Sequence, residues 1–472
     1  MNHKSILFFL GISSLLISLF SILNIFYSIY FNFTIDINSY LITFFISLSI
    51  GYLFWYLDRH HNKNFSLIDQ IIFIVLIFFF IPALIGIPYF FSLYDIGLLN
   101  SYFEAVSGFT TTGFSIIENI DYIDEPIMLW RASSQWIGGL IFLLITIGTI
   151  GSKQIKIKPA YLISGGASGI NFYNNFKYNF MKIILIYFFS TMFVIFLYSL
   201  IDIRLLDAFS LAFTTVSSGG FVPTNDLSNI IENNLQIFIL SLSLLFPIFN
   251  FFLLHDIITG QFSFRNHQED FHLAILIILL TLLFYFFVIA NIEFPSLLFA
   301  IISSISTSGI TIYSSNFDLP LFFILLPIVG GSLISTSSGF KYTRIYILLK
   351  ISYNEIYKLV KPINIVDKNL YNSDTKIQDQ DVKIAFLVFI SFIISMFILS
   401  SILSFDYLTF ENSFKLSILT LTNTVNSTLY GMGNLSFLDL NNISKMSLIF
   451  FMILGKIEVI AVIYLIKKII FR

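Results

Sequence analysis

The stretch Thr110-Thr111-Thr112-Gly113-Phe114 is short, polar and glycine-bearing, and it lies between two long apolar stretches. Similar segments recur along the chain at Ser217-Ser218-Gly219-Gly220-Phe221, at Ser306-Thr307-Ser308-Gly309 and, in a degraded form, at Asn423-Thr424-Val425-Asn426. In lipid, irregular backbone persists only where protein buries it or where it lines a wet pathway. Four copies therefore predict a pathway built by fourfold repetition.

The composition is typical of a protein embedded in lipid. Of the 472 residues, 57% are hydrophobic and only 11% are charged, and the mean hydropathy is +0.88. A soluble domain carries about 25% charged residues. The chain is therefore predicted to be an all-α integral membrane protein. The absence of cysteine from the sequence excludes disulfides, thiolate metal sites and cysteine nucleophiles.

Apolar runs predict about ten transmembrane helices, because one span needs about 20 apolar residues. The runs are 5–30, 38–57, 67–93, 130–150, 181–201, 235–258, 271–291, 320–350, 383–404 and 445–468. The first run is too long for the core of a signal peptide and lacks a small-x-small cleavage site. It is interpreted as an uncleaved first span.

The basic residues are biased to one side of the predicted membrane. With ten spans both termini fall on the same side, and most of the 25 Lys and Arg residues fall there with them. The positive-inside rule makes this side the cytoplasm. Both termini of this multi-pass protein are therefore expected to be cytoplasmic.

Each polar segment follows a short run that predicts a half-length helix. The runs are 102–109, 206–214, 296–304 and 411–421, and all four lie on the outer side between an inbound and an outbound span. Glu104, Asp207 and Glu411 fall at or near the starts of these runs, where carboxylates suit the positive end of a helix dipole. The repeating unit is predicted to be helix, half-helix, polar loop, helix.

This unit divides the chain into an N-terminal two-helix hairpin and four pore repeats. The expected bounds are 1–66 for the hairpin and 67–158, 159–265, 266–382 and 383–472 for repeats 1 to 4. The third repeat carries an additional intramembrane loop.

The polar segments have the chemistry that a cation needs. An ion that leaves water requires oxygen atoms to replace its hydration shell, and backbone carbonyls and Ser or Thr hydroxyls supply them without fixed charge. Glycine permits the positive-φ backbone that turns successive carbonyls toward one axis. A single such tripeptide is more often a turn or a helix cap. Four of them, each after a half-helix, favour an ion filter.

On these motifs the chain resembles the Trk/Ktr/HKT superfamily of potassium transporters, and within it the TrkH-like membrane subunit. The stretches that carry the resemblance are residues 103–113, Trp130-Arg131-Ala132-Ser133-Ser134-Gln135-Trp136-Ile137-Gly138-Gly139, residues 213–221, Ile305-Ser306-Thr307-Ser308-Gly309, residues 330–341 and Leu454-Gly455-Lys456-Ile457-Glu458. The resemblance implies potassium uptake through one pore and a homodimer in the lipid of a bacterial cytoplasmic (inner) membrane. It also implies a cytoplasmic TrkA-like nucleotide-binding regulatory ring as partner. It implies no cofactor besides the transported K⁺, no nucleic acid and no enzymatic activity.

The resemblance also implies which residues bind K⁺. Carried over residue by residue, the filter consists of Thr111, Thr112, Gly113, Ser217, Ser218, Gly219, Thr307, Ser308, Gly309, Val425 and Asn426. The fourth filter lacks its glycine, and Asn426 takes that place. Asn is the non-glycine residue that best tolerates left-handed backbone, but its amide could instead protrude into the pore. This departure leaves a Na⁺/K⁺-permeable divergent paralogue as an alternative.

Residues 330–340 interrupt a long apolar run and match the intramembrane gating loop of the family. The implied gate residues are Gly330, Gly331, Ser335, Thr336, Gly339 and Lys456. An ordinary Ser/Gly helix kink is the alternative for the loop. Family members carry Arg at the position of Lys456, projecting into the conduction path; the alternative is that Lys456 pairs with Glu458 or a loop carbonyl. Arg131 and Gln135 are interpreted as braces behind the first pore loop.

Two other classes of protein fit less well. A secondary transporter of another fold would show two inverted repeats with paired acidic residues inside its spans. A membrane enzyme would need a His/Asp/Glu constellation near one surface, and no enzyme motif is evident in the sequence.

Overall fold

The computed structural model describes residues 3–57, 67–93, 96–150, 169–260, 262–264, 266–287, 293–312, 319–361, 369–371, 377–406, 408–433, 435–459 and 461–462. Within these ranges the chain forms sixteen α-helices and three short 3-10 helices. The all-α membrane fold expected from composition is confirmed.

Seven helices in the described part of the chain are long and apolar enough, by length and composition, to cross a membrane. They are α1 (His3–Tyr30), α2 (Thr34–Leu57), α3 (Leu67–Ser92), α5 (Glu125–Ile150), α6 (Gly169–Leu200), α10 (Gln268–Phe287) and α14 (Asp379–Ser404). Each corresponds to one of the expected spans.

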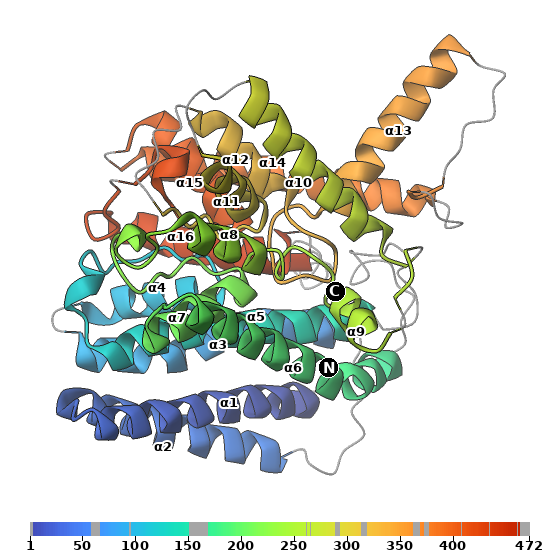
Figure 1. Cartoon of the computed structure of the whole chain (residues 1–472). Coiled ribbons are helices and arrows are strands. Elements are labelled where there is room, and N and C mark those ends of the chain that lie inside the picture. The colour runs from blue at the N-terminus through green and yellow to red at the C-terminus, as the bar shows by residue number, and fades with distance from the viewer. Residues whose placement is uncertain are drawn as a thin grey trace.

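The two helices of the N-terminal hairpin, α1 and α2, lie side by side along one flank of the molecule (Figure 1). Its two helices approach closely because glycines face each other at the crossing. A Cβ added to Gly11 would lie 2.9 Å from the carbonyl oxygen of Gly51. Small residues at such crossings are how helices pack in lipid, where burial of apolar surface adds little.

Four shorter helices precede the polar loops, as the sequence predicts. They are α4 (Gly97–Phe109), α7 (Leu205–Ser217), α11 (Phe294–Ile305) and α15 (Phe410–Thr422). The first begins at Gly97 rather than near residue 102, so Glu104 does not lie at a helix start as expected. Its carboxylate is instead held by side-chain and backbone donors in the interior.

The three remaining expected spans are not single long helices. The run 235–258 is divided into α8 (Asn234–Ser243) and α9 (Phe251–Ile258), and the run 320–350 into α12 (Pro320–Val329) and α13 (Tyr342–Val360). The last is α16 (Asn442–Ile457), and residues 463–468 of that run lie outside the described residues. The break at 244–250 was not expected. It contains Pro247, which cannot donate a helix hydrogen bond.

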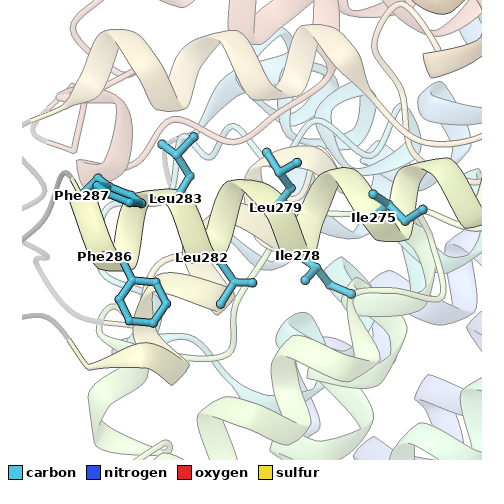
Figure 2. A pocket seen from close by; sticks show the side chains of 7 residues that line it. All are labelled: Ile275, Ile278, Leu279, Leu282, Leu283, Phe286 and Phe287. Carbon is cyan, nitrogen blue, oxygen red and sulfur yellow. The ribbon is translucent and has the colours of Figure 1, made fainter.

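The outward face of α10 carries a shallow apolar groove of about 770 Å³ (Figure 2). Its lining side chains all come from that helix: Ile275, Ile278, Leu279, Leu282, Leu283, Phe286 and Phe287. An unbroken apolar face on a spanning helix is what contact with lipid tails requires. The groove therefore belongs to the lipid-facing surface and not to the polar interior.

Many of the basic residues on which the expected membrane sidedness depends lie outside the described residues. These are Arg59, Lys63, Lys153, Lys156, Lys158, Arg265, Lys368, Lys376, Lys467, Lys468 and Arg472. The expected repeat bounds at 66, 158 and 265 fall there as well.

Candidate functional site

Each polar loop contains one non-glycine residue in the left-handed backbone region, at or just after the end of its half-helix. The four residues are Thr111 (φ 57°), Ser218 (φ 56°), Thr307 (φ 62°) and Asn423 (φ 50°). Such backbone is uncommon for these residue types. Its recurrence at one place in each repeat fixes the structural register between the loops.

The loops meet two residues beyond these positions, at Gly113, Gly220, Gly309 and Val425. A Cβ added to Gly113 would lie 2.7 Å from the Cα of Gly220, and one added to Gly220 would lie 2.5 Å from the Cβ of Val425. A Cβ added to Gly309 would lie 2.9 Å from the carbonyl oxygen of Val425. The loops approach one another so closely at these three positions that only glycine fits there. The equivalent position of the fourth loop is occupied by Val425.

This register differs from the sequence alignment of the loops by one residue in two repeats. In the second repeat Gly220, not Gly219, is equivalent to Gly113, and a Cβ on Gly219 would instead lie 2.0 Å from Oε1 of Gln135. In the fourth repeat Val425, not Asn426, takes the glycine position. The amide nitrogen of Asn426 donates within its own loop, to the carbonyl of Met432 across 3.4 Å.

The asparagine that adopts left-handed backbone is Asn423. Its side chain is fully buried. Its amide nitrogen donates to Thr112 Oγ1 of the first loop and to the carbonyl of Met452 on α16, each across 2.9 Å. Asn423 therefore ties the fourth loop to the first loop and to the last helix.

The segment between α12 and α13, residues 330–341, lies directly against the polar loops; we call it the intramembrane loop. Thr336 Oγ1 donates to the carbonyl of Val216 across 2.9 Å, and Ser218 Oγ donates to the carbonyl of Thr336 across 3.2 Å. The backbone N–H of Ser338 donates to Thr307 Oγ1 across 2.9 Å. The loop is thus bonded to the second and third polar loops.

Lys456 completes this set of contacts from α16. Its ammonium, 2% exposed, donates to Thr111 Oγ1 (2.7 Å), Ser338 Oγ (2.9 Å) and the carbonyl of Thr336 (3.2 Å). It also lies 4.5 Å from the ring centre of Phe142. Lys456 does contact a loop carbonyl, whereas Glu458 pairs with Arg344 at 2.5 Å.

A second buried lysine holds the intramembrane loop in shape. Lys341 Nζ donates to the carbonyls of Ser332 (3.2 Å), Ser335 (3.3 Å) and Ser337 (2.6 Å), and to Ser335 Oγ (3.1 Å). A charge buried in a membrane protein is costly unless backbone dipoles surround it. The serine-rich sequence of the loop supplies those oxygens.

The break between α8 and α9 (residues 244–250) and the intramembrane loop (residues 330–341) form backbone hydrogen bonds with each other. The N–H of Ser332 donates to the carbonyl of Ile248 across 2.8 Å, and the N–H of Ser337 donates to that of Pro247 across 3.1 Å. In the opposite direction, the N–H of Phe251 donates to the carbonyl of Ile334 across 3.0 Å. Pairing of this kind is how non-helical backbone persists at membrane depth.

Acidic groups at the start of α10 accept hydrogen bonds from the segments 244–250 and 330–341 and from the start of α13. Glu269 Oε1 accepts from the N–H of Leu333 across 3.1 Å and from the hydroxyl of Thr343. Asp270 accepts from the N–H of Asn250 across 2.8 Å. Just before the helix, His267 Nε2 lies 3.0 Å from Asp256 and its Nδ1 lies 3.5 Å from Asp270. Burial lowers the pKa of His267, but its contacts with Asp270 and Asp256 outweigh burial and raise it overall.

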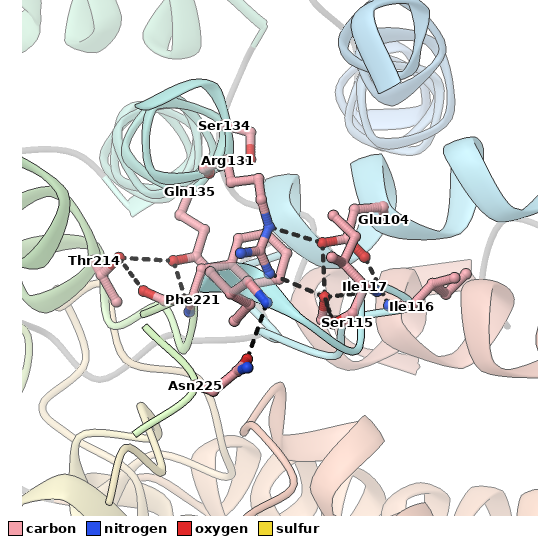
Figure 3. A network of polar contacts seen from close by, with 11 residues as sticks. Glu104, Ser115, Ile116, Ile117, Arg131, Ser134, Gln135, Thr214, Phe221 and Asn225 are labelled. Carbon is pink, nitrogen blue, oxygen red and sulfur yellow. Dashed lines mark hydrogen bonds and ion pairs between the residues drawn. The ribbon is translucent and has the colours of Figure 1, made fainter. Parts of the chain in front are cut away.

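Arg131 and Gln135 lie behind the polar loops, as the sequence predicts, but they serve two loops rather than one (Figure 3). Arg131 pairs with Glu104 at 3.0 Å and its guanidinium lies 4.2 Å from the ring centre of Phe221 in the second loop. Gln135 Oε1 accepts from the N–H of Phe221 across 3.2 Å.

Of the other predicted site residues, Ser217 and Ser308 form side-chain hydrogen bonds within their own repeats. Ser217 Oγ donates to the carbonyl of Phe213 on its own helix, and Ser308 Oγ bonds to Ser306 Oγ. Gly330 and Gly339 have positive φ, of 64° and 78°, and lie back to back. Gly331 approaches the carbonyl of Ile248, which a Cβ would meet at 2.6 Å.

Sequence reasoning missed Asn423, Lys341 and Glu269. The signal for Lys341 was its place at the end of a Ser/Gly-rich run. Glu269-Asp270 offered a pair of acids at the edge of an apolar run. No sequence pattern marked Asn423 as the left-handed residue.

The fold and the converging loops define an all-α, multi-pass membrane protein built from helix–half-helix–loop–helix units. No family model matches the chain. An uncharacterized cation transporter of Methanocaldococcus jannaschii is 24% identical, over 99% of this chain and 96% of that protein. The Trk system potassium uptake protein TrkH of Salmonella typhimurium is 24% identical over 90% of each chain, and that of Escherichia coli K12 is 23% identical over 90% of each.

Among solved structures, the potassium transporter TrkH from Vibrio parahaemolyticus matches with a TM-score of 0.85 and 21% identity, over 98% of each chain. The chain is therefore TrkH-like in sequence and in fold over nearly its whole length. The resemblance to the Trk/Ktr/HKT superfamily is confirmed, and its relatives are transport proteins rather than enzymes.

Proposed function

We propose that the chain takes up potassium ions across the cytoplasmic membrane through the four converging polar loops. The observation that carries this proposal is the convergence of Gly113, Gly220, Gly309 and Val425 at one place, each two residues after a left-handed residue. The names of the relatives, which include several potassium uptake proteins, agree with it.

The ion is bound by backbone carbonyls and hydroxyls of the polar loops. The proposed filter comprises Thr111, Thr112, Gly113, Ser217, Ser218, Gly219, Thr307, Ser308, Gly309, Val425 and Asn426, with Gly220 added by the structural register. The Thr and Ser members are completely buried. Uncharged oxygens bind a desolvated cation firmly enough to admit it and weakly enough to release it.

The intramembrane loop and Lys456 form the gate. Gly330, Gly331 and Gly339 give the loop a backbone that can rearrange, while Ser335 and Thr336 bond it to its surroundings. Lys456 places an ammonium against Thr111 on the intramembrane-loop side of the first polar loop. A fixed positive charge there opposes a passing cation, and the gate opens when Lys456 and the loop move away together.

A homodimer is proposed because α13 has an unpartnered apolar stripe. This helix projects from the body of the molecule (Figure 1). Leu349, Tyr353, Ile356 and Val360 follow helical spacing and are 62–73% exposed. A second copy of the chain would cover such a stripe. A cytoplasmic TrkA-like nucleotide-binding ring is the further proposed partner, with both termini on the cytoplasmic side.

The repeat bounds are proposed as they were expected: a hairpin at 1–66 and repeats at 67–158, 159–265, 266–382 and 383–472. One half-helix, followed by a polar loop with a left-handed residue, falls in each of the four repeats, which supports this division.

A Na⁺/K⁺-permeable paralogue is the second candidate, favoured by one observation. The fourth loop has Val425 where the others have glycine. A β-branched residue restricts backbone and side chain alike, so the fourth carbonyl has less freedom to match one ion size.

Growth of a bacterium that lacks its own potassium uptake systems tests the proposal. Expression of the chain with its ring partner should restore growth in low-potassium medium. Gly113→Asp should abolish the rescue because a side chain there meets Gly220. Gly97→Asp is the matched control, since Gly97 also has positive φ but no neighbour within 4 Å of an added Cβ. Equal rescue by both variants would contradict the proposed pathway.

A further inference from the structure

Behind the polar loops the first repeat contains an ion pair that is almost completely buried. Arg131 Nε lies 3.0 Å from Glu104 Oε1, and both side chains are only 2% exposed (Figure 3). Removing two charges from solvent is expensive unless hydrogen bonds satisfy their remaining atoms. The hydrogen bonds that the Glu104 and Arg131 side chains make to other groups therefore indicate which part of the structure the pair supports.

Glu104 and Arg131 together hold the chain that leaves the first polar loop. Glu104 Oε2 accepts from the N–H of Ile116 across 2.9 Å, and Oε1 accepts from Ser115 Oγ across 3.1 Å. Arg131 Nη2 donates to Ser115 Oγ across 3.0 Å. Ser115 and Ile116 follow Gly113 closely, so the pair fixes this limb of the loop to both α4 and α5.

The same helix, α5, also holds the second polar loop. The guanidinium of Arg131 stacks on Phe221 at 4.2 Å, and Phe221 directly follows Gly220. One helical turn further, Gln135 Oε1 accepts from the N–H of Phe221 and from Thr214 Oγ1, each across 3.2 Å. Loops 1 and 2 are thus fastened to a single rigid element at a set separation.

The other repeats have no equivalent charge. Glu104 lies seven residues before the left-handed Thr111, and the corresponding residues before Ser218, Thr307 and Asn423 are apolar: Leu211, Ala300 and Leu416. All three are buried, at 0–2% exposure. The third loop relies on a hydroxyl instead, with Ser303 Oγ donating to the carbonyl of Ile310 across 2.8 Å.

We propose that Glu104, Arg131 and Gln135 are positioning residues that set ion selectivity by fixing the spacing between polar loops 1 and 2. The inference rests on the proposed function of the loops as an ion filter. A filter that selects K⁺ by cavity size must hold its carbonyls at the spacing of the larger ion. The charged brace stiffens one half of the filter, and loops 3 and 4 adapt to it.

The test is the K⁺/Na⁺ permeability ratio of reconstituted full-length protein carrying Glu104→Gln and Arg131→Gln together. This double variant keeps hydrogen-bonding side chains and leaves no buried charge unpaired. The ratio should fall roughly two- to thirtyfold, the range seen when residues that couple to a site without touching its ligand are changed. ⁸⁶Rb⁺ flux should remain measurable.

The matched control removes another ion pair from the same helix. Glu125 pairs with Arg204 near the outer end of α5, and Arg204 is 62% exposed. Glu125→Gln with Arg204→Gln should leave the permeability ratio at the wild-type value. A purely structural role of charge on α5 would give the two double variants the same ratio.

A conducting Glu104→Gln/Arg131→Gln variant with the wild-type ratio would overturn the inference. If that variant does not fold, Phe221→Leu replaces it, because this change removes the ring on which Arg131 stacks and leaves the ion pair intact. A fall in the ratio supports the inference, and an unchanged ratio overturns it. Absence of ⁸⁶Rb⁺ flux in the wild-type protein would instead contradict the proposed function itself.

Discussion

The ammonium of Lys456 donates a hydrogen bond to the hydroxyl of Thr111 across 2.7 Å, linking the last described helix to the first polar loop. The same nitrogen contacts Ser338 and Thr336 of the intramembrane loop. One side chain therefore connects the proposed filter to the proposed gate.

Replacing Lys456 by Met should raise cation flux, since it removes a positive charge from the path. Lowering the free-energy barrier to ion passage by ~1.4 kcal/mol raises the rate about tenfold. The change is measured as ⁸⁶Rb⁺ uptake into liposomes. Lys456→Arg should retain the low flux. Lys445→Met is the matched control: Lys445 is a buried lysine of the same helix that bonds Asn100 and Leu438 instead. A Lys456→Met variant no faster than wild type would refute the barrier role.

Val425→Gly should raise the K⁺/Na⁺ permeability ratio, because it restores the glycine that the other loops have at this position. Asn426→Gly should leave the ratio unchanged, since the Asn426 amide bonds within its own loop. Reversal potentials under bi-ionic conditions give both ratios. The opposite pattern would show that Asn426, as the sequence alignment suggests, holds the filter position.

Lys341→Met should loosen the intramembrane loop. The substitution leaves the carbonyls of Ser332, Ser335 and Ser337 without their lysine donor, at a cost of roughly 1–3 kcal/mol for each buried group left unpaired. We expect a lower thermal unfolding temperature in detergent and faster hydrogen exchange across residues 330–341. Lys358→Met, at an exposed pair with Glu355, should change neither quantity. Unaltered hydrogen exchange in Lys341→Met would contradict the role of Lys341 in stabilising the intramembrane loop.

Gly138→Ala should prevent folding or destabilise the protein severely. A Cβ at this position would lie 2.0 Å from the carbonyl oxygen of Phe109, where the half-helix crosses α5. Overpacking typically costs ~1–3 kcal/mol, and here the obstacle is backbone, which cannot rotate away. Gly86→Ala, whose nearest neighbour would lie at 3.4 Å, should be tolerated. Yield and monodispersity after purification compare the two variants.

The ion pairs of His267 should make stability depend on pH. Its contacts with Asp270 and Asp256 raise its pKa in the folded protein above the unfolded value of about 6.5. Protonated His267 therefore stabilises the fold fully below about pH 6.5, and the contribution is lost as the pH rises through the raised pKa. His267→Gln should lower the unfolding temperature more at about pH 6 than at about pH 9. An equal effect at both pH values would refute the raised pKa.

The sequence predicted much of this architecture because the signals were local. Half-helices, polar loops and the interruption at 330–340 each combine an apolar run with Ser, Thr and Gly. All of them are present, although the first half-helix begins at Gly97 rather than near residue 102. The break at 244–250 was not predicted, because its residues are as apolar as the helices beside it. Pro247, followed by Asn250, which caps α9 by accepting from the N–H of Phe252, was the available signal.

The register of the loops could not be obtained from the motifs alone. Ser218-Gly219-Gly220 offers two glycines, and only the left-handed backbone of Ser218 decides between them. Asn423 and Asn426 present the same ambiguity in the fourth loop. The partners of Lys341, Lys456 and Glu269 lie far away in sequence, so only the folded chain brings them together.

Potassium conduction is tested most directly by ⁸⁶Rb⁺ uptake into proteoliposomes that contain the purified protein and have an outward K⁺ gradient. Potassium conduction through the converging loops predicts uptake that external K⁺ suppresses strongly and external Na⁺ suppresses far less. Gly113→Asp should abolish this uptake. Uptake that is absent, or that persists unchanged in Gly113→Asp, would contradict potassium conduction through the converging loops.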